Sequence, residues 1–199
     1  MKQVLIETQL FKPSKGLLSE GKMSERGNPL VEGILATCEV ENGNGRYYSE
    51  DLWKREIDKY MELVKGNRAT GELDHPESQV INLKNVSHNI KDINWDGKNI
   101  MGTIEILPTP SGNILKALID SGITVGVSSR GMGSLEQKGE LMEVQDDFEL
   151  LCWDFVSTPS NPGSFMTLKE GKENNINQYA KANSIVTEIL CANGNCPIF

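Results

Sequence analysis

Apolar and β-branched residues gather along the chain in short runs of the kind that predicts β-strands. We expect strands at residues 2–10 and 30–40, in the two halves of 80–107, and at 123–127 and 148–156. The halves of 80–107 are separated by Asp96-Gly97, a dipeptide typical of tight turns between paired strands. Residues 137–147 are polar and predict a hairpin.

Two segments instead space their apolar residues as helices do. Ser49 begins the first, acidic residues occupy its first turn, and Gly66 follows its end. Its apolar positions are Leu52, Ile57, Tyr60, Met61 and Val64. Ser111 is expected to cap the second, which ends at Ser121-Gly122. The apolar face of this second helix is Ile114, Leu115, Leu118 and Ile119.

The polar stretches between these elements suggest how the chain is organised. Lysine, serine and glycine dominate residues 11–29, which we expect to be a mobile loop. From about residue 171 the chain becomes rich in asparagine and lysine, with one weakly amphipathic segment at 176–190. We therefore expect one domain over 1–170 and an appendage over 171–199 that is processed or mobile.

Composition excludes several classes of function. The net charge of −8 repels phosphate backbones, so we expect no nucleic-acid partner. No apolar run approaches the roughly 20 residues of a membrane helix, and the N-terminus lacks the features of a secretory signal. With two histidines and one close cysteine pair, Cys191 and Cys196, a zinc site is not expected. Neither a metal nor a nucleotide cofactor is predicted.

Residues 122–135 are the best candidate seat for a nucleophile. A β-branched run leads into Ser128, Ser129 and Arg130, with three glycines around them. A buried strand can hold a hydroxyl rigidly, and a glycine-permissive turn after it can aim backbone N–H groups at a developing oxyanion. The plainer alternative is a strand that ends in a Gly/Ser turn.

A serine nucleophile needs a base, and histidine is the usual one. His88 lies in an alternating strand pattern, where a packed role is more common. His75 lies in an irregular segment beside a proline, where its position is fixed, although a surface histidine in an acidic turn is the alternative.

An acid is needed to orient that base. Asp154 lies in an otherwise apolar strand and needs a partner if it is buried, whereas on a solvent-facing side it needs none. Glu72 and Asp74 are rival orienting residues because they lie close to His75 in sequence. On an extended segment Asp74, as the immediate neighbour, points away from His75.

Three motifs in this order give a resemblance to a known family: GELDHPE at 71–77, VGVSSRGMGSL at 125–135 and DFVSTPSNPGSF at 154–165. Together they resemble the prohead core proteases of T-even-type tailed phages, and the resemblance extends from LIET at 5–8 to about residue 166. It implies a serine endopeptidase that digests the internal scaffold during capsid maturation. The implied fold is α+β, a mainly antiparallel β-barrel with surrounding helices, akin to herpesvirus assemblins.

The resemblance also implies roles for individual residues. The family's histidine matches His75, and its nucleophile matches Ser128, with Ser129 as the alternate. Assemblins place a second histidine where this chain has Asp154, which we rank above Glu72 as the third member. The side chain of Arg130, with the N–H groups of Ser129 and Arg130, is expected to stabilise the oxyanion, although a strand-end ion pair is the alternative for Arg130.

The resemblance implies that the substrates are scaffold or core proteins and capsid proteins. Cleavage would take place inside the assembling prohead, in the host cytoplasm, and self-association of the protein is a further option.

The family cleaves after a glutamate that follows an aliphatic residue two positions earlier. A pocket for that glutamate side chain needs a cation, and Arg46 or Arg68 is a candidate. Matching tripeptides occur at 5–7, 18–20, 30–32 and 186–188. Self-cleavage after Glu20 is favoured, because that site alone falls in a segment expected to be mobile, and cleavage after Glu188 is a parallel possibility.

Two other functions stay open at this point. One is a capsid-core assembly protein that keeps the fold without catalysis. The other, a more distant alternative, is a metal-dependent hydrolase that uses Glu72, Asp74 and His75.

Overall fold

The computed structural model describes residues 2–10, 23–74, 76, 78–139 and 141–157, with only the backbone for 8–10. The chain divides into two units, Met1–Met166 and Thr167–Phe199, and every described residue belongs to the first. The predicted boundary at residue 170 stays a prediction, since the residues around it lie outside the described ranges.

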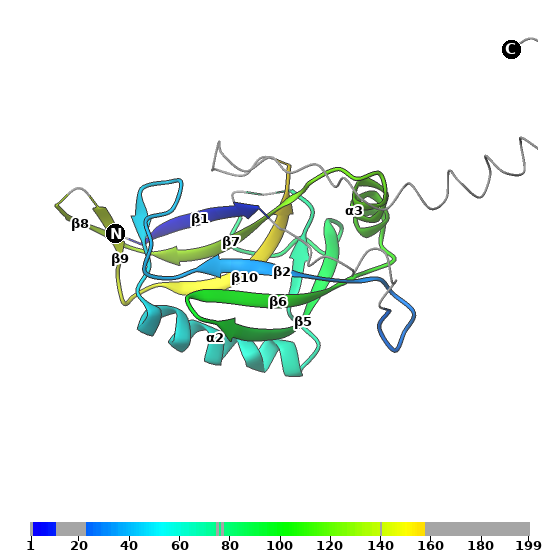
Figure 1. The fold of residues 1–199 in the computed structure, drawn as a ribbon, viewed down its shortest axis with the longest axis horizontal. Helices are drawn as coiled ribbons and strands as arrows, with labels where there is room; N and C mark the ends of the chain where they lie inside the picture. Colours follow the sequence, from blue (N-terminus) through cyan, green and yellow to red (C-terminus); the bar gives the residue numbers. More distant parts are fainter. Residues whose placement is uncertain (1, 11–22, 75, 77, 140, 158–199) are drawn as a thin grey trace, which may run out of the picture. The chain divides into compact units, whose positions relative to one another are not determined.

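The strands of the described residues form three sheets (Figure 1). The first has the order β1-β7-β10 and the second the order β2-β6-β5-β4. The third, β3-β9-β8, contains the one parallel pair of strands among them, β3 with β9. Their bounds are β1 (Gln3–Leu10), β2 (Leu30–Thr37), β3 (Arg46–Tyr47), β4 (Thr70–Glu72), β5 (Val86–Asp96), β6 (Asn99–Ile106), β7 (Gly126–Gly133), β8 (Leu135–Lys138), β9 (Leu141–Val144) and β10 (Glu149–Val156).

The predicted α+β fold with mostly antiparallel strands is confirmed, but no closed barrel is found in the part of the chain that the structure describes. The first two sheets meet where β4 runs beside β10. There one isolated parallel bridge joins Leu73 to Phe155, and the N–H of Asp74 donates to the carbonyl of Phe155 at 2.7 Å. The strand β4 has only three residues and already pairs with β5, so it has few backbone groups left to pair with β10. The two sheets are therefore joined here by one bridge and not by a continuous ladder.

The first predicted helix is confirmed as α2 (Glu50–Lys65). The hydroxyl of Ser49 accepts the N–H of Leu52 at 3.2 Å, and Gly66 caps the other end. The second helix, α3 (Pro110–Asp120), is capped by Thr109 and not by Ser111 as predicted. Proline favours the first helical position, which places the cap one residue before Pro110.

The predicted apolar face of α3 is also partly wrong. Leu115 and Ile119 are buried, but Ile114 is 55% exposed. Residues 80–85 precede β5 and form no strand, whereas the turn at Asp96-Gly97 is confirmed, with φ of 58° at Gly97.

An aromatic layer between α2 and β10 sets the orientation of β10. Trp53 of α2 stacks on Trp153 at 6.2 Å between ring centroids, and Tyr60 meets Trp153 edge-on at 4.9 Å. Because strand side chains alternate, the face of β10 opposite Trp153 carries Cys152 and Asp154. The packing of Trp153 against α2 therefore leaves Cys152 and Asp154 on the face of β10 where a site can form.

The strand β7 differs from its prediction. A buried strand was expected to hold the serine hydroxyl, and β7 does contain both serines, but the expected turn after them is wrong because β7 continues to Gly133. A Cβ atom on Gly131 would lie 2.4 Å from the ring of Phe148. Only glycine therefore lets this buried aromatic ring pack directly against the backbone of β7. The candidate nucleophile therefore lies within a strand and not at a turn.

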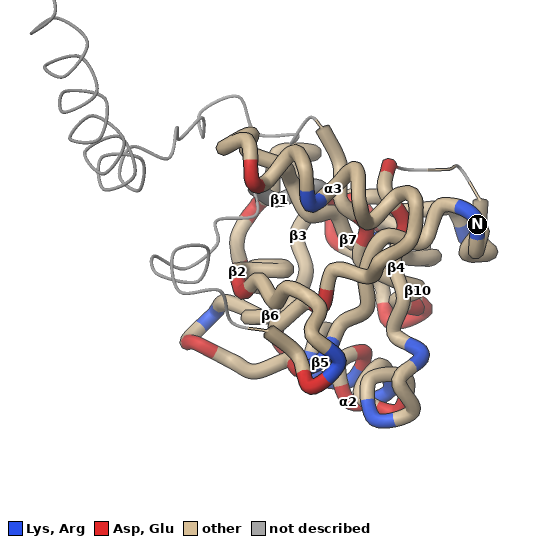
Figure 2. The backbone as a smooth tube through the Cα atoms, turned by 90° about the vertical axis from the view of Figure 1, so that its right-hand side faces the viewer, with Lys and Arg blue, Asp and Glu red and all other residues tan. Residues whose placement is uncertain are grey.

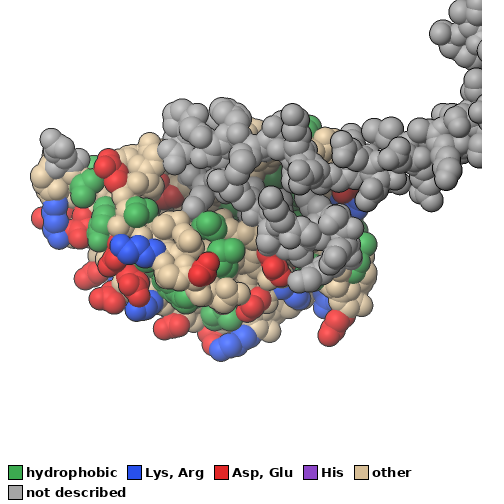
Figure 3. All heavy atoms as spheres, in the orientation of Figure 1, with side chains coloured by type: hydrophobic (Ala, Val, Ile, Leu, Met, Phe, Trp, Pro, Cys, Tyr) green, Lys and Arg blue, Asp and Glu red, His purple; other side chains and the backbone are tan. Residues whose placement is uncertain are grey.

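The charged residues of the described part are distributed over many elements (Figure 2). On the face shown in Figure 3, acidic and basic side chains are interspersed. Within the described ranges, neither helix is long and apolar enough to cross a membrane.

Candidate active site

The two candidate serines lie on opposite faces of the first sheet. Ser128 is directly opposite Asp154 of β10, and Ser129 is directly opposite Trp153. Opposed residues of neighbouring antiparallel strands point to the same face, and consecutive residues point to opposite faces. Ser129 therefore shares the face of Trp153, which packs against α2, whereas Ser128 shares the face of Asp154. Both serines are buried, as is Asp154.

Asp154 is held by groups from two other strands. One carboxylate oxygen accepts the backbone N–H of Glu72 at 2.9 Å, and the guanidinium of Arg130 lies 3.0 Å from the other. The prediction that this acid has a partner if buried is confirmed, and the charged partner seen here is Arg130. The alternative of a solvent-facing aspartate is wrong, because Asp154 is fully buried.

Arg130 occupies the centre of this buried group. Its Nη2 donates to the Glu72 carboxylate at 2.9 Å and to Cys152 Sγ at 3.1 Å, and its Nη1 donates to the carbonyl of Ser78 at 2.6 Å. Burial alone lowers the pKa of a guanidinium, but the contact with Cys152 Sγ and the charges of Asp154 and Glu72 outweigh it and raise the pKa of Arg130. The side chain therefore stays charged.

The ion pair that we weighed as the alternative role for Arg130 is present. Since β7 is the central strand of its sheet, its backbone also pairs with β1 on one side and β10 on the other around Ser129 and Arg130. Their role in oxyanion stabilisation stays a prediction.

Glu72 completes the cluster. Its second oxygen accepts the N–H of Asn82 at 2.5 Å, so both of its oxygens are bound. Two carboxylates, Glu72 and Asp154, surround one guanidinium, which gives the buried group a formal charge of −1 when all three are ionised. Among the described residues no cluster of three metal-binding side chains is found.

His75 lies outside the described residues, but the chain on either side of it is described. Asp74 donates its N–H to the carbonyl of Phe155, which follows Asp154 in β10. On the other side, the carbonyl of Ser78 accepts from Arg130. Both flanks of His75 are thus attached to the strands that carry Asp154 and Ser128.

His88 is a packed residue, as predicted. It is fully buried, with Nε2 3.0 Å from the carbonyl of Trp153 and Nδ1 2.8 Å from the hydroxyl of Ser87. A carbonyl can only accept, so Nε2 carries the proton and Nδ1 accepts from Ser87. Burial lowers the pKa of His88 from its ordinary value of 6.5 to about 4.

Sequence reasoning missed three participants in this cluster: Cys152, the carbonyl of Ser78 and the N–H of Asn82. The two backbone groups carry no signal in the sequence, because any residue type supplies them. The position of Cys152, two residues before Asp154, could have placed it on the same face. Cys152 is a buried free thiol whose pKa is raised by burial, and Cys191 and Cys196 lie outside the described ranges.

Comparisons with known proteins find similar sequences and a similar structure. The family model of the prohead core protein serine protease matches residues 7–176. The chain is 34% identical over 145 residues to the prohead core protein protease of Enterobacteria phage T4, covering 70% of this chain and 68% of that protein. A solved structure of the bacteriophage T4 capsid assembly protease superposes with a TM-score of 0.68 at 29% identity, covering 79% of this chain and 99% of that chain.

Proposed function

Because this chain belongs to the prohead core protein serine protease family, we propose that it is the endopeptidase that digests scaffold and capsid precursor proteins during phage prohead maturation. The matched relatives are named as a prohead core protein protease and a capsid assembly protease. The site of action is then the interior of the assembling prohead, in the host cytoplasm. The relation to herpesvirus assemblins and the self-association of the protein are part of the same proposal.

The nucleophile in this proposal is Ser128, with Ser129 as the alternate. The observation that supports the choice is the register of β7 with β10, in which Ser128 opposes Asp154 and Ser129 opposes the core residue Trp153. Ser129 therefore faces the α2 packing layer, whereas Ser128 lies on the face with the charged cluster.

His75 is the proposed base and Asp154 the residue that orients it. His75 removes the proton of Ser128 as the hydroxyl attacks the scissile carbonyl, and then donates that proton to the leaving amine. Asp154 stabilises the imidazolium. Water then attacks the acyl-enzyme. Glu72 is the alternate for the orienting role; it lies on β4, and its carboxylate, like that of Asp154, is bound by Arg130 and by a backbone N–H.

We assign the proposed oxyanion stabilisation to the backbone N–H groups of Ser129 and Arg130. These groups can bind the oxyanion only if they are free of strand–strand hydrogen bonds when substrate is bound. The Arg130 guanidinium, by contrast, is committed to Glu72, Asp154 and Ser78.

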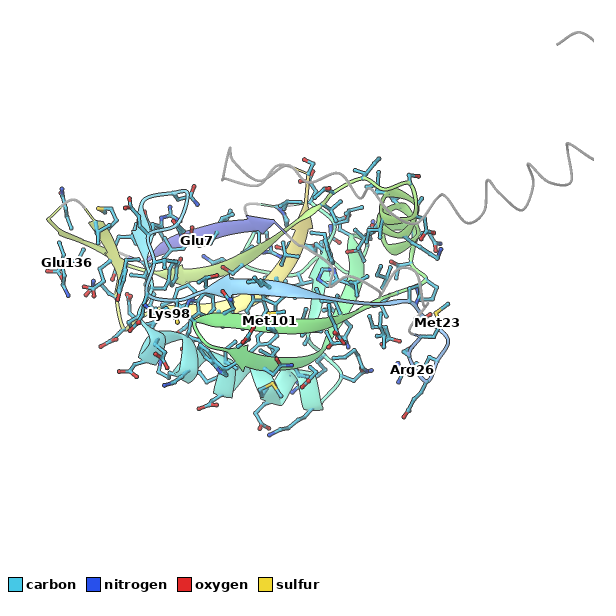
Figure 4. All side chains as sticks on the ribbon, in the orientation of Figure 1. Glu7, Met23, Arg26, Lys98, Met101 and Glu136 are labelled. Atoms are coloured by element: carbon cyan, nitrogen blue, oxygen red, sulfur yellow. The ribbon has the colours of Figure 1, made fainter. Side chains whose placement is uncertain are left out.

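Self-processing after Glu20 is the favoured cleavage of the chain by itself. Glu20 and Glu188 lie outside the described residues, but Glu7 and Glu32 lie in β1 and β2. Figure 4 labels Glu7 on β1. Its carboxylate accepts from four donors, on Asn42 at 2.6 Å, Asn44 at 2.8 Å, Arg46 at 2.7 Å and Tyr48 at 2.8 Å. A bond within a paired strand is a poor substrate, so Glu7 and Glu32 are disfavoured.

The pocket for a substrate glutamate requires a cation. Arg46 already pairs with Glu7, and its role toward substrate stays a prediction, as does that of Arg68.

A labelling and cleavage experiment tests the function. Wild type, Ser128→Ala, Ser129→Ala and His75→Gln are treated with a fluorophosphonate probe, and separately with a peptide that contains Leu-Ser-Glu-Gly. We expect Ser128→Ala to lose labelling and to cleave at least about a thousandfold more slowly. Labelling at Ser128 should require His75, and Ser129→Ala should retain most of the activity.

The same samples decide between the alternatives. Intact masses should show a shorter chain for wild type than for Ser128→Ala, and equal masses would remove self-processing. Full cleavage by Ser128→Ala would overturn the assignment of the nucleophile. A folded wild type that neither labels nor cleaves would favour a role in capsid-core assembly without catalysis.

A further inference from the structure

Arg130 links the strand of the candidate nucleophile to the segment of the candidate base, and the mechanism above gives its side chain no step. We propose that Arg130, together with Glu72, is a positioning residue that holds Glu72, Ser78 and Asn82, on either side of His75 in the sequence, against β7 and β10. The inference rests on the proposed function insofar as His75, within this segment (72–82), is the base.

Four groups from three parts of the chain converge on the guanidinium. They are the Glu72 carboxylate at the end of β4, the Ser78 carbonyl, and Cys152 and Asp154 on β10. A guanidinium presents five N–H donors in a rigid planar fork, so it can bind partners in several fixed directions at once. A lysine ammonium is a compact point charge without this fixed arrangement.

The segment is held at its beginning, middle and end. Glu72 binds Arg130 with one oxygen and the N–H of Asn82 with the other, and Ser78 binds Arg130 between them. One guanidinium and one carboxylate therefore close the segment into a loop anchored on β7.

Apolar packing holds the start of this segment, where Leu73 packs against the hydrophobic core, but it contributes less further along. Val80 is 73% exposed, and Leu83 just beyond the segment is 79% exposed. Burial of apolar surface is the usual source of loop order, and these side chains do not supply it. The polar contacts of Arg130 and Glu72 thus connect Ser78 and Asn82, farther along the segment, to the sheet.

The burial of the cluster also favours a geometric role. Arg130, Glu72 and Asp154 are each at most 1% exposed, so all three charges have lost their hydration. Buried ion pairs are often no more stabilising than well-packed apolar side chains of the same size, because desolvation offsets the attraction. What such a network supplies here is a fixed distance from Glu72 and Ser78 to the strand of Ser128.

Hydrogen exchange of the full chain tests the inference without depending on activity. In a Ser128→Ala background we compare Arg130→Lys and Glu72→Gln with the parent. We expect the amides of residues 73–82 to exchange at least about tenfold faster in both variants, as local opening becomes easier. Arg55→Lys is the matched control, because Arg55 also binds a carboxylate, that of Glu56, and a backbone carbonyl, that of Phe148. It should leave exchange at 73–82 unchanged.

Kinetics with Ser128 intact supply the functional readout. Arg130→Lys and Glu72→Gln should each lower kcat by about 10- to 100-fold with little change in KM, since misplacement of a base slows chemistry more than binding. The double variant should be little worse than either single one, because both remove the same link. Arg55→Lys should keep the parent kcat.

Each outcome bears on one proposal. Parent-like exchange at 73–82 in both variants, or parent-like kcat in both, overturns the positioning role and leaves the protease assignment intact. If Arg130→Lys does not fold, Glu72→Gln alone decides, since it keeps an acceptor for Asn82 and removes the charge. Undiminished cleavage by Ser128→Ala overturns the proposed function, and the exchange result is still interpretable.

Discussion

The buried histidine His88 makes the stability of this protein depend on pH in a way that the structure quantifies. Its pKa is lowered from 6.5 to about 4 by burial, against a smaller opposing effect of Asp154. Between these two values the unfolded chain binds a proton that the folded chain does not. Stability from this group is therefore complete above pH 6.5 and is lost as the pH falls toward 4.

The size of the loss follows from the shift. At about 1.4 kcal/mol per pH unit, a lowering from 6.5 to about 4 corresponds to about 3 kcal/mol of unfolding free energy. For a domain of this size that is a substantial part of the total, which is typically 5–15 kcal/mol. Acidification should thus weaken the fold well before most carboxylates are protonated.

The assay is urea denaturation of wild type and His88→Gln at pH 7, 6, 5 and 4.5. A glutamine amide can donate to the carbonyl of Trp153 but has no proton to gain in this range. Carboxylates titrate in both proteins, so the difference between the two curves isolates His88. We expect the advantage of wild type over the variant to shrink by about 2–3 kcal/mol between pH 7 and 4.5. Parallel curves would refute the reasoning, as would a His88 NMR titration with a midpoint near 6.5.

Four further predictions follow from particular contacts. Glu7→Gln should lower the unfolding free energy by about 2–3 kcal/mol, because it leaves Arg46 without its counter-charge, and unchanged urea denaturation would contradict this. Gly71→Ala should destabilise by at least about 3 kcal/mol or prevent soluble expression, since its Cβ would lie 1.9 Å from the carbonyl of Trp153, and a normal melting temperature would count against the packing described. Ser49→Ala should cost about 1 kcal/mol through loss of the α2 cap, measured by thermal unfolding, and no loss would show the cap to be dispensable. A chelator should leave peptide cleavage unchanged, and a metal-restorable loss would favour the metal-dependent alternative.

Elements with a local cause could be predicted from the sequence. α2 has its serine cap, its acidic first turn and its terminal glycine, and the turn at Asp96-Gly97 has the dipeptide that its geometry needs. The α3 cap was misplaced because Ser111 and Thr109 are both good capping residues, and the proline between them decides. The extent of β7 was underestimated because the sequence does not show that Gly131 faces an aromatic ring.

The candidate site could be predicted only in part, for a physical reason. The motifs identified Ser128, Asp154 and Arg130, and the need of Asp154 for a partner followed from the cost of burying a charge. Which group would meet it depended on the register between β7 and β10, and register is set by packing of the whole sheet. The convergence of Glu72 and Ser78 on one guanidinium likewise depends on where β4 ends, which is a property of the tertiary fold.

The order of strands in the first sheet has a consequence for how the protein is made. β7 lies between β1, which precedes it by more than 100 residues in the chain, and β10, which follows it and ends at Val156. Contacts between segments so distant along the chain form slowly, and β1 has to wait for its partner while most of the domain is synthesised. The face that carries Ser128 and Asp154 is therefore assembled late, after β10 has been synthesised.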